Sequence, residues 1–473
     1  MISRCILMQR SLVLFFLSLV SVTFLWIQIS MYNNINRGKQ SFLVNIAPAW
    51  ISSKHKDLKK TGQNLLSLLD DFLETCSENR ITIIIIDPTV LKSVLDDVNS
   101  QKTHHRKGCY HFCQKPIITL GVLESRLNPS GLNARVLHSL KEKKIVYTSV
   151  TGQDPRLIKL NGTMEKLVPF HYLFTRLDVI IHVIVFYDRK ALGLWHGSIS
   201  WKDFAINLDK KLISYYFHNE SVLNRFSLDI STVDGYTIRL PSEIDEFLKN
   251  LNTSRYLPCN MKRARQFYSK YGDDGTSKAG TFRKRGKEVL KIAKIILDDL
   301  RVRFWLSSGT CLGWFRQCSV ISHGKDMDIG MWITDYNKQL IDEFQNNGLY
   351  LEHLFGRVND SFQMSFKTVD DIKLDIFFFY EEETYMWNGG TQAKTGKKFK
   401  YIFPNFSLCW TEFLGMKVRV PCQTLSYIEA NYGKSWAEPV KHWDWKKSPS
   451  NVIENGEWDE KDWPDVIQFF EIQ

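Results

Sequence analysis

The apolar positions along this 473-residue chain separate a short N-terminal segment from two longer regions of mixed pattern. From Leu12 to Ile29 the residues are apolar or uncharged. A helix of that length rises about 27 Å, enough to cross the thinner membranes of the early secretory pathway. The run exceeds the apolar core of a signal peptide, and no small-residue cleavage site follows it. We therefore predict a cytoplasmic tail at 1–11, an uncleaved membrane anchor at 12–29 and a stem at 30–55.

Helical and strand-like patterns alternate after the stem. Leucines recur at helical spacing between Lys56 and Cys76, and the apolar runs Ile83–Ile86 and Val179–Phe186 are typical of buried strands. Strands of this kind between helices predict an α/β domain over 56–269 with a partly parallel sheet. We interpret this region as a scaffold, because it has neither a nucleotide-binding glycine loop nor an acidic cluster with ligand spacing.

Glycine, serine and aspartate gather at 270–284, which predicts a linker. An amphipathic helix follows between Val289 and Leu300. Residues of the types that carry out catalysis or bind ligands are frequent after it. These patterns predict a second α/β domain over 285–473, with a mixed sheet and the catalytic residues.

The N-glycosylation sequons, rather than the net charge, indicate the cellular compartment of the chain. The net charge of +11 suits nucleic acid, anionic membranes or phosphorylated substrates, and it does not distinguish among them. Sequons for N-glycosylation follow the predicted anchor and favour a luminal body of type II orientation, which excludes nucleic acid as a partner. The candidate asparagines are Asn161, Asn219, Asn252, Asn359 and Asn405.

Eight of the nine cysteines follow the predicted anchor. An even number in an oxidising compartment is compatible with disulfides, whose pairing the sequence does not give. Cys109 and Cys113, with three histidines nearby, also raise the alternative of zinc, although the usual Cys-x-x-Cys spacing is missing.

The first motif with chemical meaning is a short apolar strand that ends in Ser-Ser-Gly-Thr and passes into a helix. Such a turn directs backbone N–H groups and the positive end of the helix dipole at an anion. We predict that Ser308, Gly309 and Thr310 bind phosphate of a donor, together with Arg316 further along the helix.

Two later strands carry carboxylates. Asp326 and Asp328 lie two residues apart, so a strand places them on one face, where they repel unless a hard divalent cation lies between them. Asp375 stands inside a strongly apolar run, a position that favours a paired or metal-bound carboxylate. A phosphate-binding turn, an Asp-x-Asp strand and a later Asp strand follow one another in nucleotidyltransferase-type folds. We predict that the three aspartates bind Mg²⁺ or Mn²⁺ and carry catalysis, and Asp375 or another base would deprotonate the acceptor hydroxyl.

A basic cluster follows the third carboxylate. Lys394, Lys397 and Lys398 either form a solvated loop or contact the phosphate of a donor or acceptor, for which lysine is a good ligand. The functional interpretation predicts a phosphate clamp.

The sequence resembles a known family at these motifs. Gly309-Thr310-x-Leu312-Gly313-x-x-Arg316 with the following Asp-x-Asp is similar to the signature of the LicD phosphocholine transferases, as is Tyr432-Gly433-x-x-Trp436. The tract from Phe304 through Trp436, the anchor and the overall length resemble the vertebrate fukutin branch of that family. Lys325 stands where bacterial members often carry a denser acidic run, so the number of metal ions stays open.

The resemblance implies a phosphotransferase of the Golgi membrane with its catalytic domain in the lumen. The donor would be CDP-ribitol, the acceptor the phosphorylated O-mannosyl glycan of α-dystroglycan, and the leaving group CMP. Partners implied in the same way are fukutin-related protein and other enzymes of O-mannosyl glycan synthesis.

Two other functions fit parts of the pattern. An Asp-x-Asp motif with Mn²⁺ also occurs in sugar transferases that use nucleotide sugars, and a Golgi scaffold would recruit a partner transferase without chemistry of its own. The phosphate-binding turn and Asp375 favour attack at phosphorus over the first, and a complete carboxylate triad speaks against the second.

Overall fold

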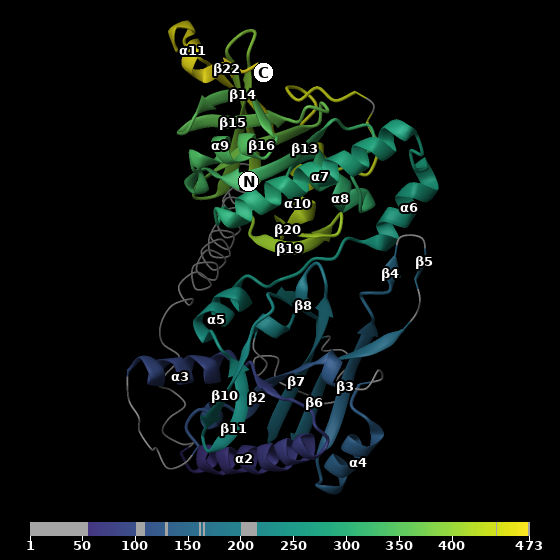
Figure 1. The fold of residues 1–473 in the computed structure, drawn as a ribbon, viewed down its shortest axis with the longest axis vertical. Helices are drawn as coiled ribbons and strands as arrows, with labels where there is room; N and C mark the ends of the chain where they lie inside the picture. Colours follow the sequence, from purple (N-terminus) through teal and green to yellow (C-terminus); the bar gives the residue numbers. More distant parts are fainter. Residues whose placement is uncertain are drawn as a thin grey trace, which may run out of the picture. The chain divides into compact units, whose positions relative to one another are not determined.

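The computed structural model describes residues 55–100, 109–127, 131–159, 162–163, 166–199, 215–440 and 442–471 (Figure 1). The predicted tail, the anchor and nearly all of the stem lie outside these residues. Among the helices that are described, none is long and apolar enough to cross a membrane. The chain divides into a unit at 1–60 and a unit at 61–473.

The first sheet has the strand order β10-β11-β1-β2-β7-β6-β3, and β8 pairs with both β7 and β9. β1 is parallel to β11 and β2 is parallel to β7, whereas the other pairs are antiparallel. The partly parallel sheet predicted for this region is therefore confirmed. Its strands are β1 Ile84–Ile85, β2 Ile117–Leu123, β3 Val146–Gln153, β6 Leu167–Arg176, β7 Val179–Arg189, β8 Gly193–His196, β9 Ser221–Leu223, β10 Leu228–Val233 and β11 Tyr236–Pro241; a separate hairpin consists of β4 Ile158–Lys159 and β5 Gly162–Thr163.

Helices cover this sheet because their apolar residues recur every three or four positions. In α2, His55–Glu78, the side chains of Leu65, Leu68, Leu69 and Phe72 are all buried. β7 is buried over its first nine residues, as expected of an inner strand covered on both faces. The other α-helices among the described residues of this region are α3 Pro88–Asn99, α4 Ala134–Glu142 and α5 Ile244–Asn252.

The second sheet has the order β21-β18-β17-β16-β15-β14-β22, and β13 joins it through a parallel pairing with β16. β12 pairs with β13, and β19 and β20 form a separate hairpin. The predicted mixed sheet is confirmed. The strands are β12 Phe304–Leu306, β13 Asp326–Trp332, β14 Tyr350–Arg357, β15 Asp360–Lys367, β16 Lys373–Glu381, β17 Tyr385–Gln392, β18 Lys397–Pro404, β19 Leu408–Phe413, β20 Met416–Pro421, β21 Val452–Glu457 and β22 Ile467–Phe469.

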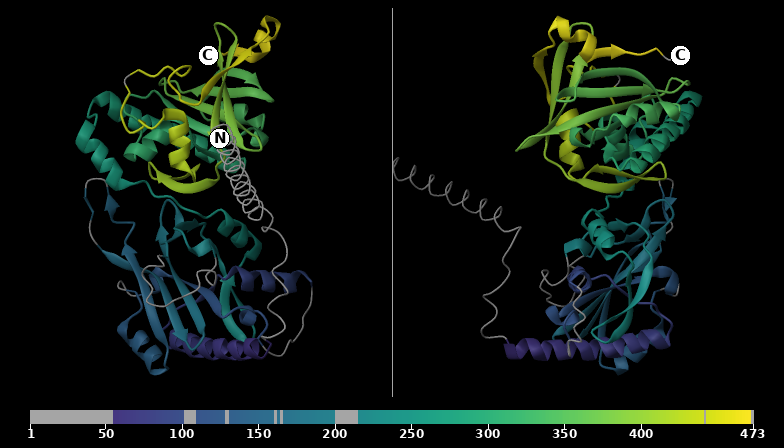
Figure 2. Two further views of the ribbon diagram at one scale, coloured as in Figure 1. Left: turned by 180° about the vertical axis from the view of Figure 1, so that it is seen from behind. Right: turned by 60° about the vertical axis from the view of Figure 1, so that its left-hand side comes forward.

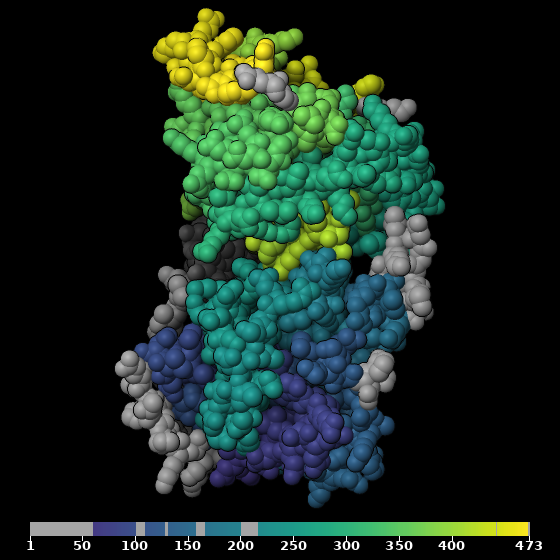
Figure 3. All heavy atoms as spheres, in the orientation of Figure 1, coloured from purple at the N-terminus to yellow at the C-terminus, as the bar shows by residue number. Residues whose placement is uncertain are grey.

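Helices pack on the strands that carry the aspartates. α7, Ser277–Asp299, lies against β13 and β16, and α9, Gln339–Asn346, lies beside α7 and β14 (Figures 1 and 2). The outer side of α7 belongs to the molecular surface (Figure 3). The other helices here are α6 Met261–Tyr271, α8 Ser308–Gln317, α10 Thr424–Tyr432 and α11 Trp463–Val466. Because α7 begins at Ser277, the irregular part of the predicted linker is confined to 272–276.

Alternation along β13 separates its two faces. Met327 points toward α7, where a Cβ on Gly286 would lie 3.0 Å from its sulfur. Asp326 and Asp328 therefore point to the opposite side of the sheet. The helices thus bury one face of the strand and leave its carboxylates on the other.

Disulfides join Cys109 to Cys113, Cys259 to Cys318 and Cys409 to Cys422, while Cys76 and Cys311 are free and buried. Because Cys109 and Cys113 are bonded to each other, their thiolates do not form a zinc site. The Cys259–Cys318 bond fixes the end of α8 to the segment that precedes α6.

A close approach between Trp305 and Gly330 holds β12 against β13. The two residues are direct partners in the ladder, and the Trp305 indole is fully buried. A Cβ on Gly330 would lie 2.4 Å from Cε2 of that ring. The indole therefore occupies the place of the missing side chain, two residues beyond Asp328.

Gly330→Ala should destabilise the fold, because the rigid indole has no free space into which to move. We expect a loss of about 1–3 kcal/mol in the free energy of unfolding, measured by urea denaturation. Gly280→Ala is the matched control, since no atom lies within 4 Å of its Cβ position on α7. That helical substitution should raise stability by up to about 1 kcal/mol, and equal effects at both positions would contradict the packing argument.

Candidate active site

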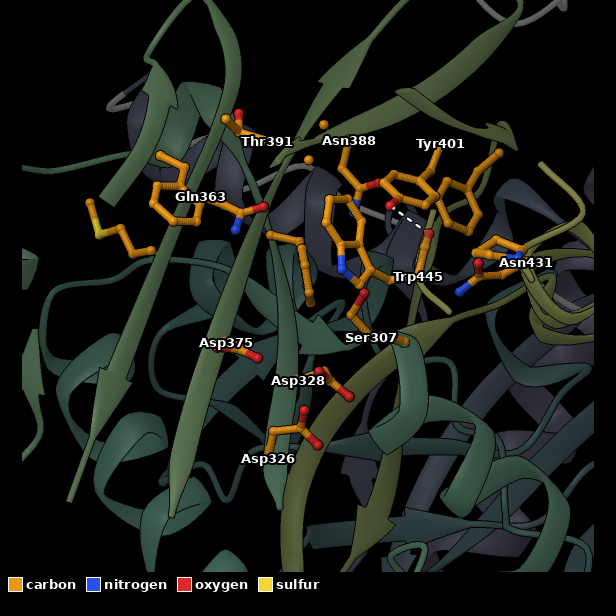
Figure 4. Close-up of a pocket in the computed structure, with 18 of the residues that line it drawn as sticks. Ser307, Asp326, Asp328, Gln363, Asp375, Asn388, Thr391, Tyr401, Asn431 and Trp445 are labelled. Atoms are coloured by element: carbon orange, nitrogen blue, oxygen red, sulfur yellow. Dashed lines mark hydrogen bonds between the residues drawn. The ribbon is translucent and has the colours of Figure 1, made fainter. Parts of the chain in front are cut away.

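The parallel pairing of β13 with β16 brings the three predicted aspartates together (Figure 4). Asp328 is the direct ladder partner of Asp375, and Asp326 lies two residues before Asp328 on the same face. One carboxylate oxygen from each of the three residues lies within 4.8 Å of the other two. Oxygen ligands at such separations suit a hard divalent cation.

Burial and repulsion from neighbouring carboxylates make Asp328 and Asp375 hard to ionise. Asp328 is buried, and burial followed by the charges of Asp326 and Asp375 raises its pKa well above the ordinary value. Burial and the charge of Asp326 raise the pKa of Asp375 to about 7, although the Ser365 hydroxyl, which donates to it at 2.5 Å, acts in the opposite direction. A cation between the groups would remove this repulsion, so the residues fit the expected metal.

The turn at the start of α8 holds Asp328 in place. The Thr310 N–H donates to Asp328 Oδ2 at 3.0 Å, and the Asp328 N–H donates to Thr310 Oγ1 at 2.7 Å. A Cβ on Gly309 would lie 3.2 Å from the same carboxylate. Thr310 and Gly309, which the sequence predicts as contacts of donor phosphate, both line the narrower of the two cavities described below and also contact the Asp328 carboxylate.

Two cavities meet at the carboxylates. The wider cavity, about 380 Å³, extends over β15, β16, β17 and β18, and the narrower cavity, about 220 Å³, lies beside α8. Ser308, Asp326, Asp328 and Trp443 line both. Asp326 and Asp328 therefore stand where two bound groups would meet, as a transfer reaction requires, while Asp375 lines the wider cavity alone.

Arg316 brings positive charge to the narrower cavity. Its guanidinium is buried, lies over the Phe267 ring at 4.7 Å and donates to the Gln317 side chain. No carboxylate of the described residues pairs with it, and burial lowers its pKa. A buried cation without an anionic partner is a suitable ligand for phosphate.

The lysine cluster does not gather at the triad. Lys397 pairs with Glu454 at 2.8 Å, and Lys398 pairs with Asp360 at 2.8 Å. Lys394 is exposed and lines a third cavity, about 600 Å³, that adjoins the wider one at His353 and Trp445. Of the three lysines, only Lys394 lines one of these three cavities.

Sequence reasoning missed several polar residues of the wider cavity. Gln363, Asn388 and Asn431 line it together with Tyr401 and Trp445 (Figure 4). Asn388 lies in the buried strand β17 and is only 7% exposed, but the Gly-Gly-Thr that follows it in the sequence is not an apolar run that would have marked it as buried. Gln363 and Asn431 gave no signal either, because they come together only through the fold.

Comparison with known proteins agrees with this geometry. Residues 301–423, which include all three aspartates, match the family model described as "LicD/FKTN/FKRP, nucleotidyltransferase domain". The second sheet with its triad is therefore the nucleotidyltransferase domain of a transferase enzyme. Residues 6–287 match the model described as "Fukutin N-terminal".

Whole-length relatives point the same way. Proteins named ribitol-5-phosphate transferase FKTN from Homo sapiens, Macaca fascicularis and Mus musculus are each 39% identical over 471 residues, covering 98% of this chain and 99% of theirs. The chain belongs to the fukutin family, and the resemblance found in its motifs is confirmed.

Asp375→Asn tests the repulsion, because it removes a charge and keeps an oxygen that accepts the Ser365 proton. The folded-state pKa of about 7 exceeds the ordinary 3.8, so ionising Asp375 destabilises the metal-free fold as pH rises through that window. In EDTA, we expect the variant and the wild type to have the same melting temperature near pH 4, and the variant to have the higher melting temperature near pH 8. The variant should lose activity when metal is present. Circular dichroism measures the melting temperatures, and a more stable wild type near pH 8 would contradict this expectation.

Proposed function

We propose that the chain transfers ribitol 5-phosphate from CDP-ribitol to the phosphorylated O-mannosyl glycan of α-dystroglycan. The observation that carries the proposal is the aspartate triad at the junction of two cavities, in a family whose relatives are named ribitol-5-phosphate transferases. In this reaction an acceptor hydroxyl oxygen attacks the phosphorus that bears ribitol. A new oxygen–phosphorus bond forms, the bond from that phosphorus to CMP breaks, and the hydroxyl proton leaves to a base.

Asp326, Asp328 and Asp375 would hold Mg²⁺ or Mn²⁺. When bound, such an ion neutralises charge on the transferred phosphoryl group and orients its oxygens. Thr310 and Ser365 keep two of the carboxylates in position through the hydrogen bonds described above. These contacts fix the ligand oxygens before the substrate arrives, which limits reorganisation during the reaction.

The phosphates of the donor would lie near Arg316, a buried residue that lines the narrower cavity. The Ser308 hydroxyl, 3.4 Å from that of Tyr432, stands at the boundary of both cavities and offers a further donor. Binding energy from these groups places the phosphorus beside the triad. The attacking hydroxyl would then approach from the wider cavity, opposite the leaving CMP.

The proposal includes the compartment and the partners. The predicted anchor over 12–29 would place the catalytic domain in the Golgi lumen as a single-pass type II protein, where α-dystroglycan and its glycan pass. Fukutin-related protein and other enzymes of O-mannosyl glycan synthesis would act beside it. Lys394 remains a proposed contact for a phosphorylated substrate next to the wider cavity.

The donor is tested by incubating the purified luminal part with CDP-ribitol, CDP-glycerol, UDP-sugars and GDP-sugars, and identifying the nucleotide released. We expect CMP from CDP-ribitol in the presence of Mg²⁺ or Mn²⁺, and none in EDTA. Asp326→Asn and Asp328→Asn should each lower turnover by orders of magnitude, and the double variant should be little worse. Asp335→Asn is the control, since that carboxylate pairs with Arg303 outside both cavities.

Each alternative function has its own outcome in this assay. Release of UDP or GDP with sugar transfer would favour a glycosyltransferase, and a folded protein without turnover on any donor would favour a scaffold. Full activity in EDTA would contradict the metal assignment.

The type II orientation is tested by glycosidase treatment of the full chain made in cells. Asn252, Asn359 and Asn405 are exposed, Asn219 is half-buried, and Asn161 lies outside the described residues. A domain in the lumen is exposed to the glycosylation machinery. We therefore expect glycosidase treatment to remove N-glycans and to increase the mobility of the chain on a gel. Asn359→Gln and Asn405→Gln should each remove one glycan, whereas Asn250→Gln, outside any sequon, should not. An unmodified chain would contradict the luminal body.

A further inference from the structure

Three carboxamide side chains in the wider cavity make no hydrogen bond with any described residue. They come from different elements: Gln363 from β15, Asn388 from β17 and Asn431 from α10 (Figure 4). Asn388 and Asn431 are each only 7% exposed. The three side chains share this cavity with all three aspartates.

Unpaired buried carboxamides are unusual. Most buried polar side chains have partners, and leaving one unsatisfied costs about 1–3 kcal/mol. At Asn388 the Oδ1 atom is buried without a partner. A carboxamide offers two donors and an acceptor, so in either orientation Asn388 keeps capacity for a bound group. Such an unpaired polar group in a strand that borders a cavity indicates a ligand that supplies hydrogen bonds.

Aromatic groups complete the same cavity. Tyr401 is the ladder partner of Asn388, and its hydroxyl donates to the Trp445 carbonyl at 2.9 Å. The Trp445 ring packs on Gly390, where a Cβ would lie 3.2 Å from Cζ3. Trp445 itself is 40% exposed. A half-exposed indole beside neutral carboxamides suits a ligand with hydroxyl groups and C–H faces.

We propose that the wider cavity binds a run of vicinal hydroxyls next to the transferred phosphate, with Asn388 as a specificity-determining residue. The ligand is a polyhydroxy group, either the polyol chain of the donor or a sugar of the acceptor. Neutral carboxamides match hydroxyls, which both donate and accept, whereas the cationic Arg316 in the other cavity matches phosphate. The inference deepens the proposed function and rests on it for the identity of the reaction.

A nucleobase is the alternative ligand for carboxamides and an indole. The position of the cavity favours the polyhydroxy group, because Asp375 and the three carboxamides line the same space. The donor polyol is attached to the transferred phosphorus, and the acceptor sugar carries the attacking hydroxyl. The base of the donor is further from these atoms, because its ribose lies between. The two ligands differ in an experiment, because CMP contains the base and lacks the polyol.

The central test replaces Asn388 by Leu, which keeps the approximate size and removes the hydrogen bonds. We expect kcat/KM for ribitol-phosphate transfer to fall about tenfold to a hundredfold, because an unpaired hydroxyl is left in the complex. Inhibition by CMP should stay within about twofold of the wild type. Asn451→Leu is the matched control, since that carboxamide donates to the Ile402 carbonyl at 2.9 Å and lies outside the cavity.

The arms of the experiment separate the two sources of hydroxyls. If the donor polyol binds here, Asn388→Leu raises KM for CDP-ribitol and abolishes the preference for CDP-ribitol over the shorter CDP-glycerol. If an acceptor sugar binds here, KM for the glycan rises and the donor preference is kept. Unchanged kinetics, or CMP binding that weakens in parallel with turnover, overturns the proposal.

Two further measurements keep the inference testable. Gln363→Leu, at a half-buried position of the same cavity, should give the same pattern if Asn388→Leu fails to fold. Melting temperatures with Mn²⁺ and either ribitol 5-phosphate or inorganic phosphate need no turnover. A larger rise with ribitol 5-phosphate, lost in Asn388→Leu, supports the polyhydroxy site even where CDP-ribitol is not a substrate. Equal rises with both ligands, together with an unchanged acceptor KM, overturn it.

Discussion

The repulsion among three carboxylates governs the architecture of the catalytic domain. Two parallel strands are placed side by side so that Asp328 and Asp375 become ladder partners, with Asp326 on the same face. Such an arrangement opposes folding, and the surrounding structure offsets it with a helix N-terminus and a serine hydroxyl directed at the carboxylates. Helices bury the opposite face of β13, which keeps the charged groups in one plane. A cation bound among the three carboxylates would relieve this repulsion.

The division of the site into two cavities follows from the same strands. β13 contributes Asp326 and Asp328 to both cavities. The narrower cavity lies beside α8, and β15, β16, β17 and β18 line the wider one. Positive charge is found in the narrower space, at Arg316, and neutral carboxamides in the wider one. The two spaces therefore differ in the chemistry that they accept. A transfer enzyme gains selectivity from such a division, because each substrate meets its own set of partners.

The sequence predicted those features that are local. Buried strands such as β7, the helix α2 and the Asp-x-Asp strand follow from periodicity, and Asp375 was evident as a charge within an apolar run. Partners distant in sequence were not predictable. Thr310 was predicted to contact phosphate, and its hydrogen bond to Asp328 was not foreseen, because only the fold brings α8 and β13 together. Lys397 and Lys398 met acidic partners on other strands for the same reason.

The contact between Trp305 and Gly330 restricts how this domain can diverge. Enlarging residue 330 produces a clash with the indole, and shrinking residue 305 leaves a cavity that costs about 3–5 kcal/mol. Each single step therefore passes through an unstable intermediate, although a paired exchange would restore the volume. We expect substitutions at residues 305 and 330 to occur together among related sequences, or not to occur. The packing of Trp305 on Gly330 therefore limits sequence change in the strand that carries Asp326 and Asp328.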